Sequence, residues 1–143
     1  MAVGAGAGPS RPRVAGRLRM PIVDVELVPG ENEPALRAGL ARELADSLGE
    51  LFATGPGRTW VRLRILPRGD YAENGGELPP ALRPVFVTLL RAVLPEPAEF
   101  RREVRGIAER VAAITGRPVE QVHVLVLPPA RGRIAFGGVL REE

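Results

Sequence analysis

"TGPGRTWVRLRILP", residues 54–67, is matched in nearly the same register by "TGRPVEQVHVLVLPP", residues 115–129. Each stretch starts with a glycine-containing turn and continues as an alternating apolar run, which is typical of a half-buried strand. A repeated supersecondary unit sets the architecture of a whole domain, so it is the first feature to establish. The two matching stretches predict a chain built from two copies of one unit.

The first copy has the pattern of strand, helix and strand. Val23, Val25 and Leu27 alternate with polar residues, which predicts a strand. Asn, Glu and Pro at 32–34 form a helix start signal. Leucines then recur every three or four residues along one helical face: Leu36, Leu40, Leu44, Leu48 and Leu51. A second strand is predicted over 60–66, after the turn at 55–57.

The second copy repeats this order. A strand is predicted over 84–90, and Pro97 begins a helix that ends at Gly116. The apolar face of that helix consists of Phe100, Val104, Ile107, Val111 and Ile114. The last main strand is expected over 122–127. Two parallel strands bridged by one helix should result in each copy, and together they predict an α+β fold with a four-stranded mixed sheet and two helices on one face.

Composition limits the chemistry that this chain can perform. It has no cysteine, all 20 of its basic residues are arginines, His123 is the one histidine, and Ser10 and Ser47 are the only serines. Disulfides, thiolate nucleophiles, Schiff-base lysines and cysteine-bound zinc are excluded, and a metal site or a Ser-His-acid triad is not expected. We therefore expect no metal and no cofactor, and a catalytic base would be a carboxylate, His123, Tyr71 or a chain terminus.

The net charge of +3 comes from one end of the chain. Residues 1–19 contain four arginines and no acid, whereas residues 20–143 contain 16 arginines and 17 acids. The few aromatic residues are scattered, so no basic face with stacking rings is expected to bind nucleic acid. No apolar run approaches the roughly 18 residues of a membrane span. We interpret 1–19 as a disordered leader or a mis-assigned start, and 20–143 as one cytoplasmic domain.

Met20 and Pro21 stand directly before the first predicted strand. In one interpretation Pro21 is the first residue of that strand, where the missing N–H costs little. In the other, translation begins at Met20, and removal of the methionine leaves Pro21 with a free secondary amine. Such an amine titrates near pH 8 when unperturbed, and burial or nearby cations move its pKa toward neutrality, where a general base works best.

Three segments carry a resemblance to a known family. "MPIVDVELVPGENEPALRAGLARELADSL" (20–48) resembles the amino-terminal segment of 4-oxalocrotonate tautomerase, and "VRLRILPRGDYAENGGE" (61–77) resembles its later strand and hairpin with paired glycines. "TGRPVEQVHVLVLPPARGRIAFGG" (115–138) is similar to the same region again and to macrophage migration inhibitory factor. The chain thus resembles the tautomerase superfamily, with fused βαβ units at 20–77 and 78–143 and a Gly-Gly hairpin in each.

The resemblance implies a function and a set of residues. Pro21 would be the general base for keto-enol proton transfer on a small 2-oxo or 2-hydroxy-dienoic acid. Arg62 would clamp the substrate carboxylate and stabilise the enolate, and Arg64, on the same strand face, would be a second clamp. Tyr71 would line the apolar wall of the pocket, and His123 would reach a pocket across a subunit interface. A homo-oligomer, most simply a trimer, is expected.

Other interpretations of the same residues stay open. Arg62 and Arg64 also suit solvated strand positions, Tyr71 suits loop packing, and a lone strand histidine such as His123 is often an interface residue. The family's second binding arginine is replaced here by Glu31, which argues against a dicarboxylate substrate. The alternative function is a non-catalytic tautomerase-fold or ferredoxin-like protein that acts through binding or assembly.

Overall fold

The computed structural model of the protein describes residues 21–142, so the predicted leader at 1–19 and Met20 lie outside the described residues. The order strand, helix, strand occurs twice along the chain, and a short hairpin follows. The elements are β1 (Ile22–Leu27), α2 (Leu40–Leu51), β2 (Trp60–Ile65), β3 (Val85–Leu90), α3 (Pro97–Thr115), β4 (Val122–Val126), β5 (Ile134–Phe136) and β6 (Val139–Arg141). No helix within 21–142 is both long enough and apolar enough to cross a bilayer.

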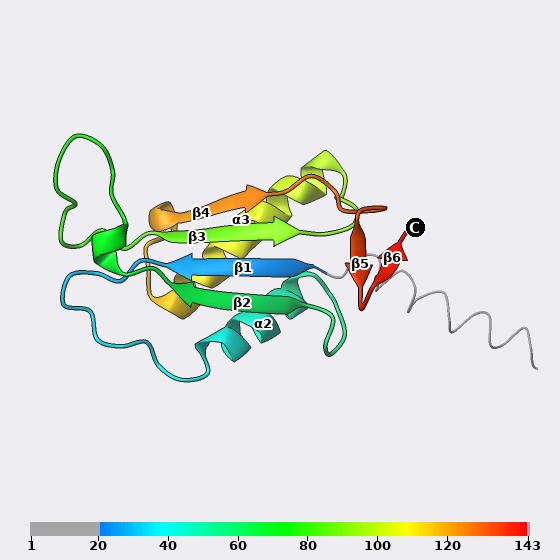
Figure 1. Ribbon diagram of the computed structural model, residues 1–143, viewed down its shortest axis with the longest axis horizontal. Helices are drawn as coiled ribbons and strands as arrows, with labels where there is room; N and C mark the ends of the chain where they lie inside the picture. Colours follow the sequence, from blue (N-terminus) through cyan, green and yellow to red (C-terminus); the bar gives the residue numbers. More distant parts are fainter. Residues whose placement is uncertain (1–20, 143) are drawn as a thin grey trace, which may run out of the picture.

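Four strands form one mixed sheet in the order β2-β1-β3-β4. β1 pairs in parallel with β2, β3 pairs in parallel with β4, and β1 pairs antiparallel with β3. Both helices lie on the same face of this sheet (Figure 1). The predicted α+β architecture is confirmed. A ferredoxin-like fold splits its βαβ units, whereas β1 and β2 here are direct neighbours, so that arrangement does not apply.

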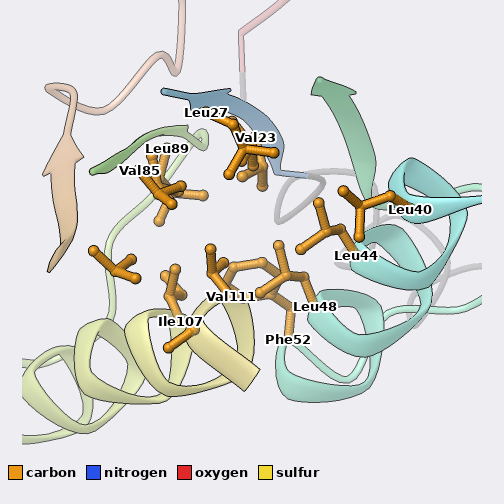
Figure 2. Close-up of a cluster of buried hydrophobic side chains, with 14 residues drawn as sticks. Val23, Leu27, Leu40, Leu44, Leu48, Phe52, Val85, Leu89, Ile107 and Val111 are labelled. Carbon is orange, nitrogen blue, oxygen red and sulfur yellow. The ribbon is translucent and has the colours of Figure 1, made fainter. Parts of the chain in front are cut away.

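The core fills the space between the sheet and the two helices (Figure 2). Every second strand residue points into it, and the helices contribute their apolar stripes. The fully buried side chains of this cluster are Val23, Val25, Leu27, Val85, Val87, Leu89, Leu44, Leu48, Ile107 and Val111. Each contributes roughly 1.5–3 kcal/mol by burial.

The other face of the sheet is covered by neither helix, and we call it the open face. Its residues alternate with those of the core, and the strand register aligns them in rows across the sheet. One row is Trp60, Ile22 and Leu90; the next is Arg62, Asp24, Thr88 and Leu125; the third is Arg64, Glu26, Phe86 and His123. This face therefore mixes an apolar end, a charged centre and an aromatic end.

The first helix begins later than predicted. α2 starts at Leu40 and not at 32–34. Asn32 adopts a left-handed turn conformation with φ of 64°, and Gly39, with φ of 83°, precedes the helix. The Glu33 carboxylate, expected in the first helical turn, instead accepts hydrogen bonds from the Gly30 amide and from Arg117. The residues of the predicted helix start therefore make turn and tertiary contacts in place of a helical turn. Leu36 still packs against the core.

The two Gly-Gly pairs adopt different structures. Gly137 and Gly138 connect β5 to β6 with positive φ angles of 60° and 85°, so the predicted second hairpin is confirmed. Gly75 and Gly76 lie in the connection between β2 and β3, where 66–84 contains no strand. Arg68 holds that connection by donating to the carbonyl oxygens of Pro29, Leu82 and Pro79. The prediction of a hairpin in the first unit was therefore wrong.

Candidate active site

Pro21 lies immediately before β1, at the end of the sheet next to the β5–β6 hairpin (Figure 1). It is less than 2% exposed. Its carbonyl oxygen accepts a hydrogen bond from the Trp60 amide at 3.1 Å, which extends the β1–β2 pairing by one residue. The proline nitrogen has no proton to donate, so this strand-start position costs no ladder bond. In the chain as it stands, that nitrogen is in peptide linkage with Met20.

The strand row next to Pro21, on the open face, is apolar. Ile22, the next residue, pairs with Trp60 on one side and with Leu90 on the other. The Trp60 ring meets Phe136 of the hairpin edge to face, with centroids 5.4 Å apart and planes at 89°. The Trp60 indole donates to the Gly57 carbonyl oxygen at 2.9 Å, which fixes the ring. An amine at this place would be poorly solvated, and burial disfavours its charged form.

Arg62 lies at the centre of the open face. Its guanidinium donates to both carboxylate oxygens of Asp24, the cross-strand neighbour, at 2.6 and 2.9 Å. The hydrogen bond to Asp24 and its negative charge raise the pKa of Arg62. The Arg62 side chain is 65% exposed and that of Asp24 is 23% exposed. Arg62 thus presents a carboxylate-binding fork to solvent, and an internal carboxylate occupies it.

Arg64, Phe86, His123 and Tyr71 lie at the end of the sheet far from Pro21. The register places Glu26 between Arg64 and Phe86, and His123 beyond Phe86. The Phe86 ring contacts the rings of His123 and Tyr71, at centroid distances of 5.4 and 5.8 Å. The sequence did not single out Phe86, because its contacts with Tyr71 and His123 depend on the strand register and on the path of the loop after β2.

Tyr71 is committed to a local partner. Its hydroxyl donates to Glu73 at 2.6 Å, and this hydrogen bond, with partial burial and the charge of Glu73, raises the pKa of Tyr71. Beside the ring is a surface hollow that Glu31, Arg68, Glu77 and Leu78 also line. Tyr71 therefore donates its hydroxyl to an acidic partner in the connection that follows β2.

The five predicted site residues do not converge within one chain. Arg62 pairs with Asp24, three residues along β1 from Pro21, or about 10 Å. The row of Arg64 and His123 crosses β1 at Glu26, five residues from Pro21, or about 17 Å. The structure brings Tyr71 and His123 together through Phe86 and leaves Pro21 at the other end. A pocket that unites both ends requires more than one copy of the chain.

Within residues 21–142, no three His, Asp or Glu side chains gather as a metal ion would require. Glu26 and Asp24 on the open face are adjacent on one strand face, but each lies beside an arginine in its row.

No protein-family model and no curated protein sequence matches the chain. The fold of the chain, in contrast, matches those of solved structures. The "Q0 fused 4-OT wild type symmetric trimer" has a TM-score of 0.66 at 14% identity, covering 85% of this chain and 95% of that one. The crystal structure of Pt0534 inactivated by 2-oxo-3-pentynoate gives 0.63 at 18% identity, covering 85% and 95%.

A third match comes from the migration-inhibitory-factor branch. MIF2 of Leishmania major has a TM-score of 0.60 at 14% identity, covering 85% of this chain and 97% of that one. The match covers at least 95% of each of these three chains, whereas at most 18% of the aligned residues are identical. The chain therefore has the tautomerase fold, the α+β fold of the 4-OT and MIF structures.

Proposed function

We propose that the protein is a cofactor-independent tautomerase in which Pro21, once it is the first residue, acts as the general base. The observation that carries this proposal is the position of Pro21: a buried proline at the start of β1, one residue before the apolar row of Trp60, Ile22 and Leu90, in a chain with the tautomerase fold. A secondary amine there has the burial that lowers an amine pKa toward the working pH.

The reaction needs one base and no co-reactant. The neutral Pro21 amine takes a proton from the enol oxygen or the α-carbon of a 2-oxo or 2-hydroxy-dienoic acid. The electron pair moves through the conjugated system, and the prolinium returns the proton to another carbon, so that the substrate is isomerised and the amine regenerated. The neighbour Pt0534 was inactivated by 2-oxo-3-pentynoate, a 2-oxo acid, which favours the same substrate class for this chain.

Arg62 is proposed as the carboxylate clamp. Its pair with Asp24 displays the bidentate geometry that a substrate carboxylate would use. A substrate must displace Asp24 from the guanidinium, and Arg64, two residues along the same face, is the second candidate. Tyr71 and His123, joined through Phe86, are proposed to line the apolar part of the pocket.

We propose a homotrimer that completes this pocket. Pro21 and the cluster of Arg64, Tyr71 and His123 lie at opposite ends of the sheet, so the two ends meet only between copies. The open face also exposes apolar side chains, with Leu125 61% and Trp60 42% exposed. Neighbouring fused 4-OT structures are described as symmetric and asymmetric trimers, which favours three copies.

A second candidate function rests on the peptide bond between Met20 and Pro21. While that bond is intact, the Pro21 nitrogen is an amide with no basicity, and the protein would act through binding or assembly alone. The same fold and the same open face would serve that role. Mass spectrometry of the protein purified from its native host distinguishes the two candidates, because a mature chain that begins at Met1 favours binding and one that begins at Pro21 favours catalysis.

The decisive experiment compares two proteins produced from Met20, the parent and Pro21→Ala. After mass spectrometry has verified the first residue, both are assayed for ketonisation of 2-hydroxymuconate and phenylenolpyruvate. The parent is expected to turn over at least one substrate, and Pro21→Ala, which replaces the secondary amine by a primary one in a different position, is expected to lose most of this activity. Equal activity in both proteins would refute Pro21 as the base.

A further inference from the structure

Asp24 binds the guanidinium of Arg62 in the middle row of the open face. It lies on β1, between Arg62 of β2 and Thr88 of β3. Val23 and Val25, its neighbours along the strand, are each 1% exposed and belong to the core, so Asp24 faces the open side. Both of its carboxylate oxygens accept from Arg62, at 2.6 and 2.9 Å. The two donors that recognise a carboxylate are therefore occupied within the chain itself.

The stability of the sheet does not account for this aspartate. Aspartate is depleted in strands, and an ion pair whose arginine is 65% exposed contributes little to stability. The Asp24 side chain is only 23% exposed, so its carboxylate gives up part of its hydration to lie against the guanidinium. A residue that brings a hydration cost and little stability, on the predicted clamp itself, points to a role in binding.

Opposite charges face each other across β1 and β2. Arg62 lies across from Asp24, and Arg64 lies across from Glu26, so each arginine of β2 faces a carboxylate of β1. The charges of the two pairs cancel, and an approaching carboxylate is attracted by Arg62 and repelled by Asp24. The ligand carboxylate also needs the two guanidinium donors that Asp24 already uses. The two carboxylates therefore compete for Arg62.

Building on the function proposed above, we propose that Asp24 is the specificity-determining residue of the site: it competes with the substrate for Arg62 and restricts the site to acids with one carboxylate. A ligand that binds only the open form of a clamp has its apparent affinity reduced by the open fraction. If about one clamp in ten is open, the apparent Kd of a monocarboxylate is about tenfold higher than it would be without Asp24.

A second carboxylate on the ligand makes the effect larger. Once displaced from Arg62, Asp24 remains in its row as an unpaired negative charge, and Glu26 lies two residues along the same strand face, about 7 Å away. Like charges brought together by binding weaken a complex, and such repulsion is a common means of rejecting a ligand. A dicarboxylate must displace Asp24 and also place its second charge on this acidic strand face. The open face thus favours a 2-oxo acid whose remainder is apolar.

The test measures binding and needs no turnover. Trp60 is the only tryptophan of the chain, and it lies two residues from Arg62 on the same strand face, so its fluorescence reports a ligand at the clamp. Pentan-2-one, 2-oxopentanoate and 2-oxopentanedioate share a five-carbon ketone chain and carry no, one and two carboxylates. They are titrated into the full chain and into Asp24→Asn at neutral pH.

The three ligands should respond to Asp24→Asn in order of their charge. The Kd of 2-oxopentanoate should fall about tenfold, because Arg62 is no longer occupied by an internal carboxylate. The Kd of 2-oxopentanedioate should fall by a larger factor, because the repulsion by Asp24 is removed as well. The response to pentan-2-one should stay the same, because a neutral ketone does not compete with Asp24.

Two controls separate competition for Arg62 from a general effect of charge. Arg37 and Glu43 form a pair with the same two-bond geometry, at 2.9 and 2.8 Å, and Glu43 belongs to α2, on the layer that covers the opposite face of the sheet (Figure 1). Glu43→Gln should therefore leave every Kd unchanged. In an Arg62→Ala background, Asp24→Asn should change the Kd of 2-oxopentanoate by less than about twofold, because the shared donors are gone.

Four results would overturn the inference: an unchanged Kd of 2-oxopentanoate in Asp24→Asn, failure of both acids to bind either protein, a gain for 2-oxopentanedioate no larger than that for 2-oxopentanoate, and an equal gain in either control. Urea unfolding verifies that each variant is folded, and Asp24→Thr, which suits a strand, takes the place of Asp24→Asn if that variant is not. Binding is measured with the Pro21 nitrogen in peptide linkage. A tenfold gain therefore stands even where protein that begins at Pro21 is inactive, which refutes only the tautomerase proposal, and turnover by Pro21 with an unchanged Kd refutes only the role of Asp24.

Discussion

At the residue scale, two roles of Arg62 can be told apart by experiment. Arg62 is either a clamp for the substrate carboxylate or only a surface ion-pair partner of Asp24. Arg62→Ala is expected to lower kcat/KM on a carboxylate substrate by roughly 10²–10³-fold, the loss seen when one oxyanion donor is removed. The denaturant midpoint should stay nearly unchanged, because the Arg62 side chain is 65% exposed and exposed pairs contribute little. Steady-state kinetics and urea unfolding of the same preparations measure both effects.

Arg62→Lys and Arg64→Ala are the controls for that prediction. A lysine supplies a point charge without the planar fork, so Arg62→Lys should recover only part of the lost activity. Arg64 lies two residues along the same strand face and faces Glu26. If Arg62→Ala keeps the activity of the parent while Arg64→Ala loses most of it, the clamp is Arg64. The assignment made from the sequence is then shifted by two residues along β2.

Glu33 makes the stability of the fold sensitive to acid. Burial opposes its ionisation, but hydrogen bonds from the Gly30 amide and Arg117, together with the charges of Arg117 and Arg83, outweigh burial and lower the pKa of Glu33 below its ordinary value of 4.5. The unfolded chain therefore binds a proton at a higher pH than the folded one. The stabilisation is fully present above about pH 4.5 and is lost as the pH falls through the lower, folded-state pKa.

Unfolding experiments at several pH values check this expectation. The parent should lose free energy of unfolding as the pH falls below about 4.5 and through the lower, folded-state pKa of Glu33. Glu33→Gln should be less stable at neutral pH and show a flatter acid profile. Glu43, which pairs with Arg37 on the surface with side chains 48% and 55% exposed, supplies the control Glu43→Gln. An acid profile that is the same in Glu33→Gln and in the parent would contradict the assignment.

At the scale of elements, the contact between α2 and α3 depends on one glycine. A Cβ at Gly106 would lie 3.0 and 3.3 Å from the two terminal methyl carbons of Leu51. Gly106→Val should therefore destabilise the protein by about 1–3 kcal/mol through overpacking, although glycine is the weaker helix former. Ala113→Val, at an exposed position of the same helix, carries only the helix cost of a β-branched residue. Equal midpoints of the two variants in urea would refute a close contact at Gly106.

The elements also show what a sequence can specify. The strands and α3 were predicted within one or two residues, because alternation and helical spacing are local signals that the core enforces: Val23, Val25 and Leu27 are all buried as the pattern required. The start of α2 was missed because Glu33 bonds to Arg117, 84 residues away, a contact that no local pattern contains. Gly75 and Gly76 were taken as a hairpin for a similar reason, since the carbonyl oxygens that Arg68 binds decide that loop.

At the scale of the whole molecule, the candidate site could be predicted only in part. The sequence singled out Pro21 through its place before a strand, and Arg62 and Arg64 through their shared strand face. It gave no sign of Asp24 on Arg62 or of Phe86 between Tyr71 and His123, because each depends on the register between strands. Register follows from the packing of the entire sheet.

Assembly into a trimer is a property of the whole molecule, and it depends on whether the open face is buried between copies. Leu125 lies on the edge strand β4, in the middle row of that face, and is 61% exposed in the single chain. If three copies bury this face, Leu125→Arg places an unpaired cation in an interface, which costs several kcal/mol. Sedimentation at micromolar concentration should then show a trimer for the parent and smaller species for Leu125→Arg.

The control for Leu125→Arg adds the same charge on the outer side of the molecule. Ala113 is an exposed residue of α3, on the layer that covers the opposite face of the sheet (Figure 1). Ala113→Arg should leave the trimer intact, because exposed arginines are well tolerated on a helix surface. A parent that sediments as a monomer would exclude both the trimer and a pocket shared between copies. Pro21 would then have to act at its own end of the sheet, with Trp60 and Phe136 but without Tyr71 and His123.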